Sequence, residues 1–237
     1  MADEIELSLD IPSVCARKLA SGEVDMALTP VAIIPELQEA WLVSDYCIGS
    51  VGTVKTVCLF SEKPLHEIKR VLLDFHSRTS VMLTRILCEQ YWKIQPEFVQ
   101  ATEGFETQIF GDTAALIIGD RTIGLHQRYP YVYDLGEAWT TWTGLPFVFA
   151  AWVSARPLDA ELIAKFNNAL ASGLDHLPEL IKILPSMPAG FDLDTYYREN
   201  ISYELDDAKW TALNRFLQLL AGEKGYHLQR QIIPETI

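Results

Sequence analysis

Apolar and polar residues follow one another along the chain in patterns that predict a mixed α/β fold. Ile5, Leu7 and Leu9 alternate with polar residues, which is the period of a half-buried strand. Apolar residues then recur at helical spacing from Pro12 to Gly22, and the stretch 24–28 predicts a second strand that leads into Thr29-Pro30. A strand, a helix and a strand with short joints predict a right-handed crossover in a parallel sheet.

Apolar runs further along the chain predict more strands, separated by helices. The strands are expected at residues 41–48, 53–60, 71–73, 98–100, 114–118 and 147–153. Asp134 and Glu137 have the spacing of a capping box, so a short helix is expected to begin there and to end at Gly144. Beyond Pro157 the leucines recur at helical spacing, which is typical of packing faces.

The ten residues from Leu72 to Val81 place a polar loop between a strand and a helix. The helix is expected to begin within Ser77-Arg78-Thr79-Ser80, which combines three hydroxyls with a guanidinium. The first N–H groups of a helix have no partner inside the helix, and the helix dipole is positive at that end. This arrangement favours the binding of a carboxylate or a phosphate. The alternative is an ordinary Ser/Thr N-cap beside a solvated arginine.

Two of the expected strands are apolar on both faces and could therefore run through a core. These strands, 53–60 and 147–153, bracket a compact block of the chain. A block inserted into a discontinuous domain predicts two lobes, in which residues 1–57 and 148–237 form the first lobe and residues 58–147 form the second. A ligand cleft is expected between the lobes, because junctions of this kind are preferred positions for pockets.

Polar residues beside apolar strands are further candidates for a binding site. Thr29 would lie at the carboxyl end of a strand, where open α/β sheets bind ligands. Lys55 and Thr56 would be polar groups in an otherwise buried strand, although a lysine at the edge of a sheet could simply snorkel to solvent. Asp120 follows a buried strand, where it could cap a turn or point into a cleft.

Composition and charge narrow the range of functions. Apolar residues make up 49% of the chain and charged residues 22%, as in soluble globular proteins. The net charge of −13 argues against non-specific binding to nucleic acid or to an anionic membrane. The N-terminal residues lack the features of a signal peptide, and no apolar run has the length of a membrane span. We therefore expect a cytoplasmic protein that is a monomer or a homodimer.

The usual signatures of catalysis are missing from the sequence. There is no GxSxG, HExxH or P-loop motif, and the five histidines are scattered without the spacing of metal ligands. The four cysteines are far apart in apolar surroundings, which predicts buried thiols in a reducing compartment. We expect neither a metal nor a cofactor. The pattern fits an enzyme without a strong acid or base of its own, or a binding protein.

Four segments resemble the chorismate dehydratase family (MqnA), which acts in menaquinone biosynthesis by the futalosine pathway. They are GSVGTVKTVCLFS at 49–61, SRTSV at 77–81, LIIGDR at 116–121 and DLGEAWTTWTGLPFVFAAW at 134–152. The likeness extends from about residue 5 to about residue 180. The last segment is the most specific, because a Trp-x-x-Trp-x-Gly-Leu-Pro-Phe-Val-Phe string rarely arises by chance.

The resemblance implies an α/β fold similar to type II periplasmic binding proteins, with two lobes joined by two crossing strands. It implies that the substrate is the dicarboxylate chorismate, which loses water to give 3-[(1-carboxyvinyl)oxy]benzoate. Thr56 matches a family hydroxyl that faces the substrate, Ser77 to Ser80 match an anion-holding helix start, and Thr29 aligns with a binding turn. Because family members begin with a strand and an Asn-bearing motif, the resemblance also implies a segment upstream of Met1.

Two other functions are compatible with the same sequence. A solute-binding protein for a small carboxylate would share the fold, since one fold serves many functions. The related 1,4-dihydroxy-6-naphthoate synthase is the other alternative, against which the Trp-x-x-Trp-x-Gly-Leu-Pro segment favours the dehydratase. In the dehydratase a carboxylate of the substrate could help to remove the proton, because the chain offers no evident base.

Overall fold

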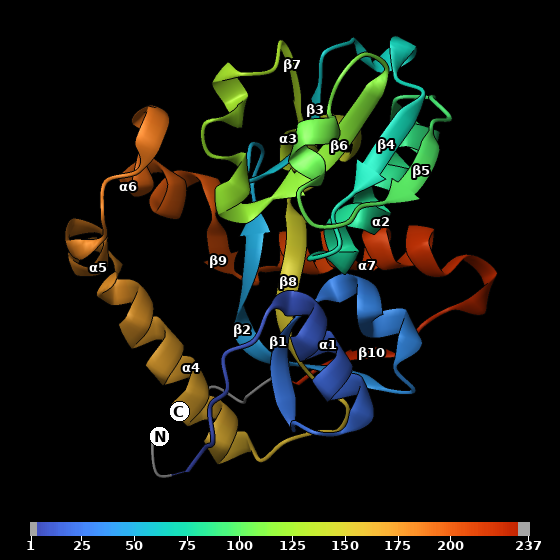
Figure 1. Ribbon diagram of the computed structural model, residues 1–237. Coiled ribbons are helices and arrows are strands. Elements are labelled where there is room, and N and C mark those ends of the chain that lie inside the picture. The colour runs from blue at the N-terminus through green and yellow to red at the C-terminus, as the bar shows by residue number, and fades with distance from the viewer. Residues whose placement is uncertain (1–3, 232–237) are drawn as a thin grey trace. The chain divides into compact units, whose positions relative to one another are not determined.

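The computed structural model describes residues 4–231 and contains two mixed sheets with helices around them (Figure 1). The described chain divides into two compact units. Unit 1 comprises the residues up to Gly49, Val148–Leu184 and the residues from Tyr203 onward, and unit 2 comprises Ser50–Phe147 and Pro185–Ser202. Among the described residues, none of the helices combines the length and the apolar character that crossing a membrane requires. The α/β class expected from the sequence is confirmed.

The sheet of unit 1 has the strand order β1-β8-β2-β10, and β9 also pairs with β2. β1 runs antiparallel to β8, with Met26 opposite Ser154, and β10 runs parallel to β2. The bounds of these strands are β1 Met26–Pro30, β2 Ala40–Ser50, β8 Phe147–Ser154, β9 Ser202–Glu204 and β10 Leu228–Arg230.

The helices of unit 1 begin and end at residues whose chemistry explains their bounds. α1 (Pro12–Ser21) has proline at its first position and ends at Gly22, whose φ of 73° is the left-handed conformation that glycine favours. α1 packs against β1, and α7 (Asp207–Ala221) packs against a 3₁₀ turn at Val31–Glu36. The remaining helices of this unit are α4 (Ala160–Asp175) and α5 (Leu177–Ile183).

The sheet of unit 2 has the order β5-β4-β6-β3-β7 and is covered on both faces. Its strands are β3 Val57–Ser61, β4 Arg70–Leu73, β5 Glu97–Gln100, β6 Thr113–Ile118 and β7 Tyr131–Asp134. Phe60, Leu72 and Ile117 belong to the core on one face, and Leu59 and Val71 belong to the core on the other. The helices α2 (Arg78–Ile86) and α3 (Leu135–Thr143) pack against each other, and also against β6 and β3 respectively.

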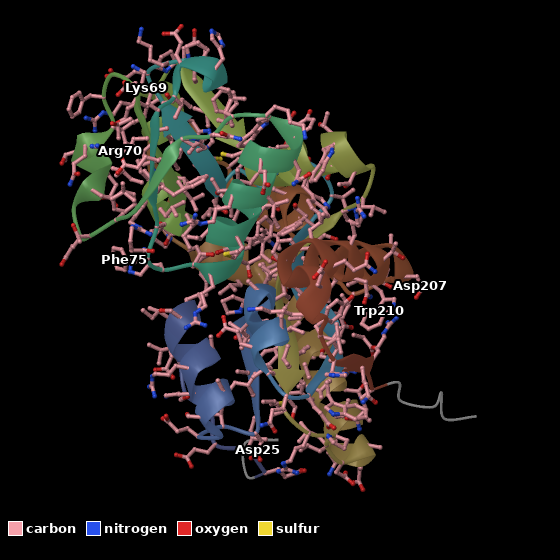
Figure 2. The ribbon with its side chains drawn as sticks, turned by 90° about the vertical axis from the view of Figure 1, so that its right-hand side faces the viewer. Asp25, Lys69, Arg70, Phe75, Asp207 and Trp210 are labelled. Atoms are coloured by element: carbon pink, nitrogen blue, oxygen red, sulfur yellow. The ribbon has the colours of Figure 1, made fainter. Side chains whose placement is uncertain are left out.

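Strand directions bring several loops of unit 2 to one edge of its sheet. β4 is parallel to β6, whereas β3 is antiparallel to both β6 and β7. The loops that follow β4 and β6 and the segment that precedes β3 therefore meet at the same edge, which we call the loop edge (residues 51–56, 74–80 and 119–122). Figure 2 shows Lys69 and Arg70 at the opposite end of β4 from Phe75, which lies in the loop that follows β4 (residues 74–80).

The strand predicted at residues 5–9 is absent. Leu7 is 70% exposed and Leu9 is 91% exposed, and no strand of the described residues pairs with this stretch. A half-buried strand needs a paired neighbour and a core to cover one face, and this segment has neither. The parallel crossover predicted from it is also wrong, because β1 pairs with the antiparallel strand β8.

The strand predicted at 53–60 begins later, at Val57. Lys55 has a φ of 65°, which is incompatible with an extended strand, so residues 53–56 form a turn before β3. Lys55 and Thr56 are therefore turn residues rather than polar groups within a buried strand. By contrast, the strand, loop and helix predicted over residues 72–81 are confirmed as β4, the loop after it and α2.

The bounds of the two units differ from the predicted lobes. Residues 50–57 and 185–202 belong to unit 2, although the sequence placed both stretches in the first lobe. Residues 185–202 contact the rest of unit 2 through Asn200, whose Nδ2 donates a hydrogen bond of 3.1 Å to the carbonyl of Thr53. The two-lobed arrangement with a ligand cleft stays a prediction.

Candidate functional site

Backbone hydrogen bonds join the loops of the loop edge to one another. The N–H of Gly119 donates to the carbonyl of Thr56 over 2.8 Å, which ties the end of β6 to the start of β3. The N–H of Ile118 donates to Oδ2 of Asp74 over 3.1 Å, which ties β6 to the loop after β4. These loops carry most of the predicted site residues on one scaffold, namely Lys55, Thr56, Ser77, Arg78, Thr79, Ser80 and Asp120.

The turn at residues 53–56, which we call the 53–56 turn, is held by the carboxylate of Asp134. The N–H groups of Val54 and Lys55 donate to Oδ2 of this carboxylate over 3.1 Å and 2.6 Å. Oδ1 also accepts from the N–H of Glu137 over 3.0 Å, so Asp134 is the N-cap of α3 as the sequence predicted. One buried carboxylate thus fixes both the turn and the helix.

Gly136 allows the segment before the turn to approach α3 closely. A Cβ atom at this position would lie 2.6 Å from the carbonyl oxygen of Gly52, a distance that real Cβ atoms do not reach. Only glycine fits here without a shift of the backbone. The Asp134-Leu135-Gly136 start of the most specific sequence segment therefore has a physical role, which is to hold residues 50–56 in place.

Lys55 combines an unusual backbone conformation with an ammonium group available for a ligand. Its φ of 65° costs on the order of 1 kcal/mol for a residue with a Cβ atom. Its carbonyl accepts a hydrogen bond from Nε2 of His126 over 2.8 Å, and its side chain is half-buried. Within residues 4–231, the Lys55 ammonium forms no ion pair.

Thr56 is only 5% exposed, and its hydroxyl lies 2.9 Å from the hydroxyl of Tyr196. Tyr196 begins a π-helical turn (Tyr196–Asn200) that follows the short helix α6 (Leu193–Thr195). Burial raises the pKa of the Tyr196 phenol, and the negative charge of Asp120 adds to this rise. The phenol is therefore protonated at neutral pH. No pattern in the sequence indicated that this tyrosine would meet Thr56.

The start of α2 is an N-cap built from two serines. Oγ of Ser77 accepts from the N–H of Ser80 over 3.1 Å and donates to Oγ of Ser80 over 2.9 Å. Ser80 is 2% exposed and Thr79 is 1% exposed, whereas Arg78 is exposed at the first helical position. The N-cap interpretation of Ser77 is thus confirmed, and the binding of an anion at this helix start stays a prediction.

Asp74 is a charged residue of the loop edge that the sequence analysis missed. Its side chain is fully buried, and its carboxylate pairs with the guanidinium of Arg121 and accepts from the N–H groups of His76 and Ile118. Arg121 also pairs with Glu106 over 3.1 Å, so its charge is neutralised within the protein. An acid at the end of an apolar run, the feature that singled out Asp120, was the signal that could have pointed to Asp74.

Asp120 and Thr29 occupy different settings. Asp120 is part of a 3₁₀ turn at Gly119–Thr122, where it is exposed, and its charge reaches the Tyr196 phenol. Thr29 belongs to unit 1, on β1, where it is fully buried. Its Oγ1 has no hydrogen-bond partner among the described residues.

Across residues 4–231, no group of three or more His, Cys, Asp or Glu side chains is arranged to hold a metal ion.

Comparisons with known proteins agree with this description of the fold. A chorismate dehydratase of Thermus thermophilus is 29% identical over 234 residues, which cover 89% of this chain and 84% of that protein. Protein AF1704 of Archaeoglobus fulgidus superposes with a TM-score of 0.64 at 16% identity, covering 92% of this chain and 85% of that one. A structure described as an ABC transporter from Parabacteroides distasonis superposes with a TM-score of 0.60 at 17% identity, covering 91% and 81%.

These two structures show a shared fold, because their sequence identities are low. The sequence also matches a protein family described as menaquinone biosynthesis, and the match extends over residues 1–222. Since this match includes most of the chain, the protein belongs to the menaquinone biosynthesis family.

Proposed function

We propose that the protein is a chorismate dehydratase, a carbon–oxygen lyase that removes water from chorismate to give 3-[(1-carboxyvinyl)oxy]benzoate in the futalosine pathway. The observation that carries this proposal is the composition of the loop edge. The loop edge holds the buried hydroxyl of Thr56, the ammonium of Lys55, and the start of α2 beside Arg78. Among the described residues, the Lys55 ammonium forms no ion pair. The Thermus thermophilus chorismate dehydratase, at 29% identity, supports the same reaction.

The reaction requires little acid–base strength from the protein. A hydroxyl group and a hydrogen leave neighbouring ring carbons as water, and the ring becomes aromatic, which provides the driving force. The protein then has to hold the two carboxylates, exclude water and orient the departing hydroxyl. In this proposal a carboxylate of the substrate takes the proton that leaves the ring.

Three loop-edge residues and Asp134 have specific roles in the proposal. Lys55 and the first N–H groups of α2, with Arg78, bind the substrate carboxylates, since cations and helix starts both favour anions. Thr56 forms a hydrogen bond to the departing hydroxyl and stabilises the charge that develops on it. Asp134 is a supporting residue, because its carboxylate is occupied by the N–H groups of the 53–56 turn.

A product assay tests this function. Purified protein incubated with chorismate should release an aromatic compound of the mass of chorismate less one water, identified by chromatography and mass spectrometry against a blank without protein. Recovery of unchanged chorismate from a protein that binds it would refute the dehydratase and favour a solute-binding protein. A failure to bind chorismate would also refute the dehydratase.

Replacing Arg78 by alanine should weaken the binding of chorismate or of the product. We expect a loss of roughly 2-fold to 10-fold in affinity at low salt, because the guanidinium is exposed and its interaction is screened by water and ions. Calorimetric titrations at low and moderate salt should show the difference shrinking as salt rises. Arg85→Ala, at the other end of α2, is the matched control and should leave the affinity unchanged. Equal affinities of Arg78→Ala and the wild type would remove Arg78 from the site.

Replacing Lys55 by glycine should separate ligand binding from stability. Glycine tolerates a φ of 65°, so the free energy of unfolding should change by less than about 1 kcal/mol. The affinity for the product should fall roughly 3-fold to 10-fold because a cation is lost. Lys93→Gly is the matched control, since Lys93 also has a positive φ, of 56°, and lies outside the loop edge. An unchanged affinity in Lys55→Gly would contradict the role of Lys55.

A further inference from the structure

Tyr196 joins the 53–56 turn from a part of the chain distant in sequence. Its hydroxyl lies 2.9 Å from Oγ1 of Thr56, and the residues between them number well over one hundred. Four residues further on, Asn200 donates from Nδ2 to the carbonyl of Thr53 over 3.1 Å. The segment Asp192–Asn200, which we call the docking segment, is thus attached to both ends of the turn.

A charge interaction adds to these two hydrogen bonds. The pKa of the Asp192 carboxyl is lowered, mainly by a hydrogen bond from the hydroxyl of Thr195, and the positive charge of Lys55 contributes to the same shift. Asp192 is also the N-cap of α6, which fixes the start of the docking segment. Every residue from Thr53 to Thr56 except Val54 therefore interacts with the docking segment, and Val54 is held by Asp134.

The hydrogen-bonding capacity of a threonine hydroxyl gives the contact with Tyr196 a consequence. The hydroxyl has one proton to donate and two lone pairs that accept. In the described part of the chain, the Tyr196 hydroxyl is the sole hydrogen-bond partner of Oγ1 of Thr56. If the protonated phenol donates to Oγ1, the proton of Thr56 is left for another acceptor. Without this contact, the Thr56 hydroxyl would rotate freely and point its proton in several directions.

We infer that Tyr196 is a positioning residue for the dehydration of chorismate, whose phenol donates to Oγ1 of Thr56 and so directs the threonine proton toward the departing hydroxyl of the substrate. This role rests on the proposed function and extends it to a residue outside the segments that resemble the family. The raised pKa of Tyr196 agrees with it, because the phenol keeps its proton across the neutral range. Tyr196 acts through Thr56 and does not itself touch the substrate.

A double-mutant cycle on turnover tests the inference. Tyr196→Phe removes the hydroxyl and keeps the ring, and should lower kcat about 3-fold to 10-fold, the scale of one hydrogen bond, with KM nearly unchanged. In a Thr56→Val background the same substitution should have no further effect on kcat, since there is no hydroxyl left to direct. In a Thr56→Ser background, which restores the hydroxyl, the effect should return.

Tyr197→Phe is the matched control, because Tyr197 lies in the same docking segment and its hydroxyl forms no hydrogen bond among the described residues. It should leave kcat unchanged. Thermal unfolding of each variant separates loss of structure from loss of positioning. A fall in kcat by the same factor in the wild-type and Thr56→Val backgrounds would show a purely structural role and overturn the inference.

The test also distinguishes this inference from the function on which it rests. If the wild-type protein converts chorismate and Tyr196→Phe converts it at the same rate, the positioning role alone is refuted. If the wild-type protein leaves chorismate unchanged, the proposed function is refuted and the positioning role with it.

Discussion

Replacing Thr56 by valine should slow the dehydration of chorismate by roughly 10-fold to 1000-fold, the effect of removing one hydrogen-bond donor aimed at developing charge. Valine has nearly the same shape as threonine, so the turn should keep its conformation. Among the described residues, the buried Thr56 side chain has one hydrogen-bond partner, the hydroxyl of Tyr196. Because Tyr196 is half-buried, its hydroxyl can bind water once the threonine hydroxyl is removed. Steady-state kinetics with chorismate should show the loss in kcat rather than in KM.

Two further substitutions make this result specific. Thr56→Ser should retain most of the activity because the hydroxyl remains. Thr53→Val changes the other threonine of the same turn and should be neutral, since the residue contributes its carbonyl rather than its hydroxyl to the docking segment. Normal turnover by Thr56→Val would exclude Thr56 from the chemistry, and an equal loss in Thr53→Val would point to a general disturbance of the turn.

Replacing Asp134 by alanine should lower the free energy of unfolding by about 2–5 kcal/mol. The substitution removes the acceptor for the N–H groups of Val54, Lys55 and Glu137, and a buried donor without a partner costs about 1–3 kcal/mol. Loss of the N-cap of α3 adds to this cost. Denaturant unfolding followed by circular dichroism would measure the change.

Asp159→Ala provides the matched control for a lost cap. Asp159 is also an N-cap aspartate, on α4, but among the described residues its carboxylate accepts only from the exposed N–H of Leu162, over 3.0 Å. We expect this substitution to cost about 1 kcal/mol. If Asp134→Ala cost no more than Asp159→Ala, the carboxylate of Asp134 would not be what holds the 53–56 turn.

Local sequence signals predicted the elements in which one segment determines its own structure. The proline and glycine that bound α1, the serine that caps α2 and the aspartate that caps α3 all act within a few residues. The buried strands β3 and β6 were also recognisable, because a core strand is apolar along most of its length. The same signals placed Ser77 at a helix start and Asp120 just past a strand, whereas they placed Thr56 within the strand that in fact begins after it.

Features that depend on partners distant in sequence were not predictable in this way. Alternation at Ile5, Leu7 and Leu9 resembled a strand, but a strand also needs a neighbour to pair with, which the pattern does not encode. The positive φ of Lys55 is held by the carboxylate of Asp134, which lies 79 positions away in the chain. Tyr196 could not be linked to Thr56 because no motif connects a helical tyrosine with a turn that precedes a buried strand.

A crystal structure of the protein with 3-[(1-carboxyvinyl)oxy]benzoate bound would test directly whether the substrate binds and reacts at the loop edge of unit 2. We expect a product carboxylate within hydrogen-bonding distance of the Lys55 ammonium or of the first N–H groups of α2. Oγ1 of Thr56 should face the ring carbon from which the hydroxyl departs, with the Tyr196 hydroxyl still bound to Oγ1. Product bound elsewhere, out of contact with Lys55, Thr56 and the start of α2, would show that the loop edge is not the active site.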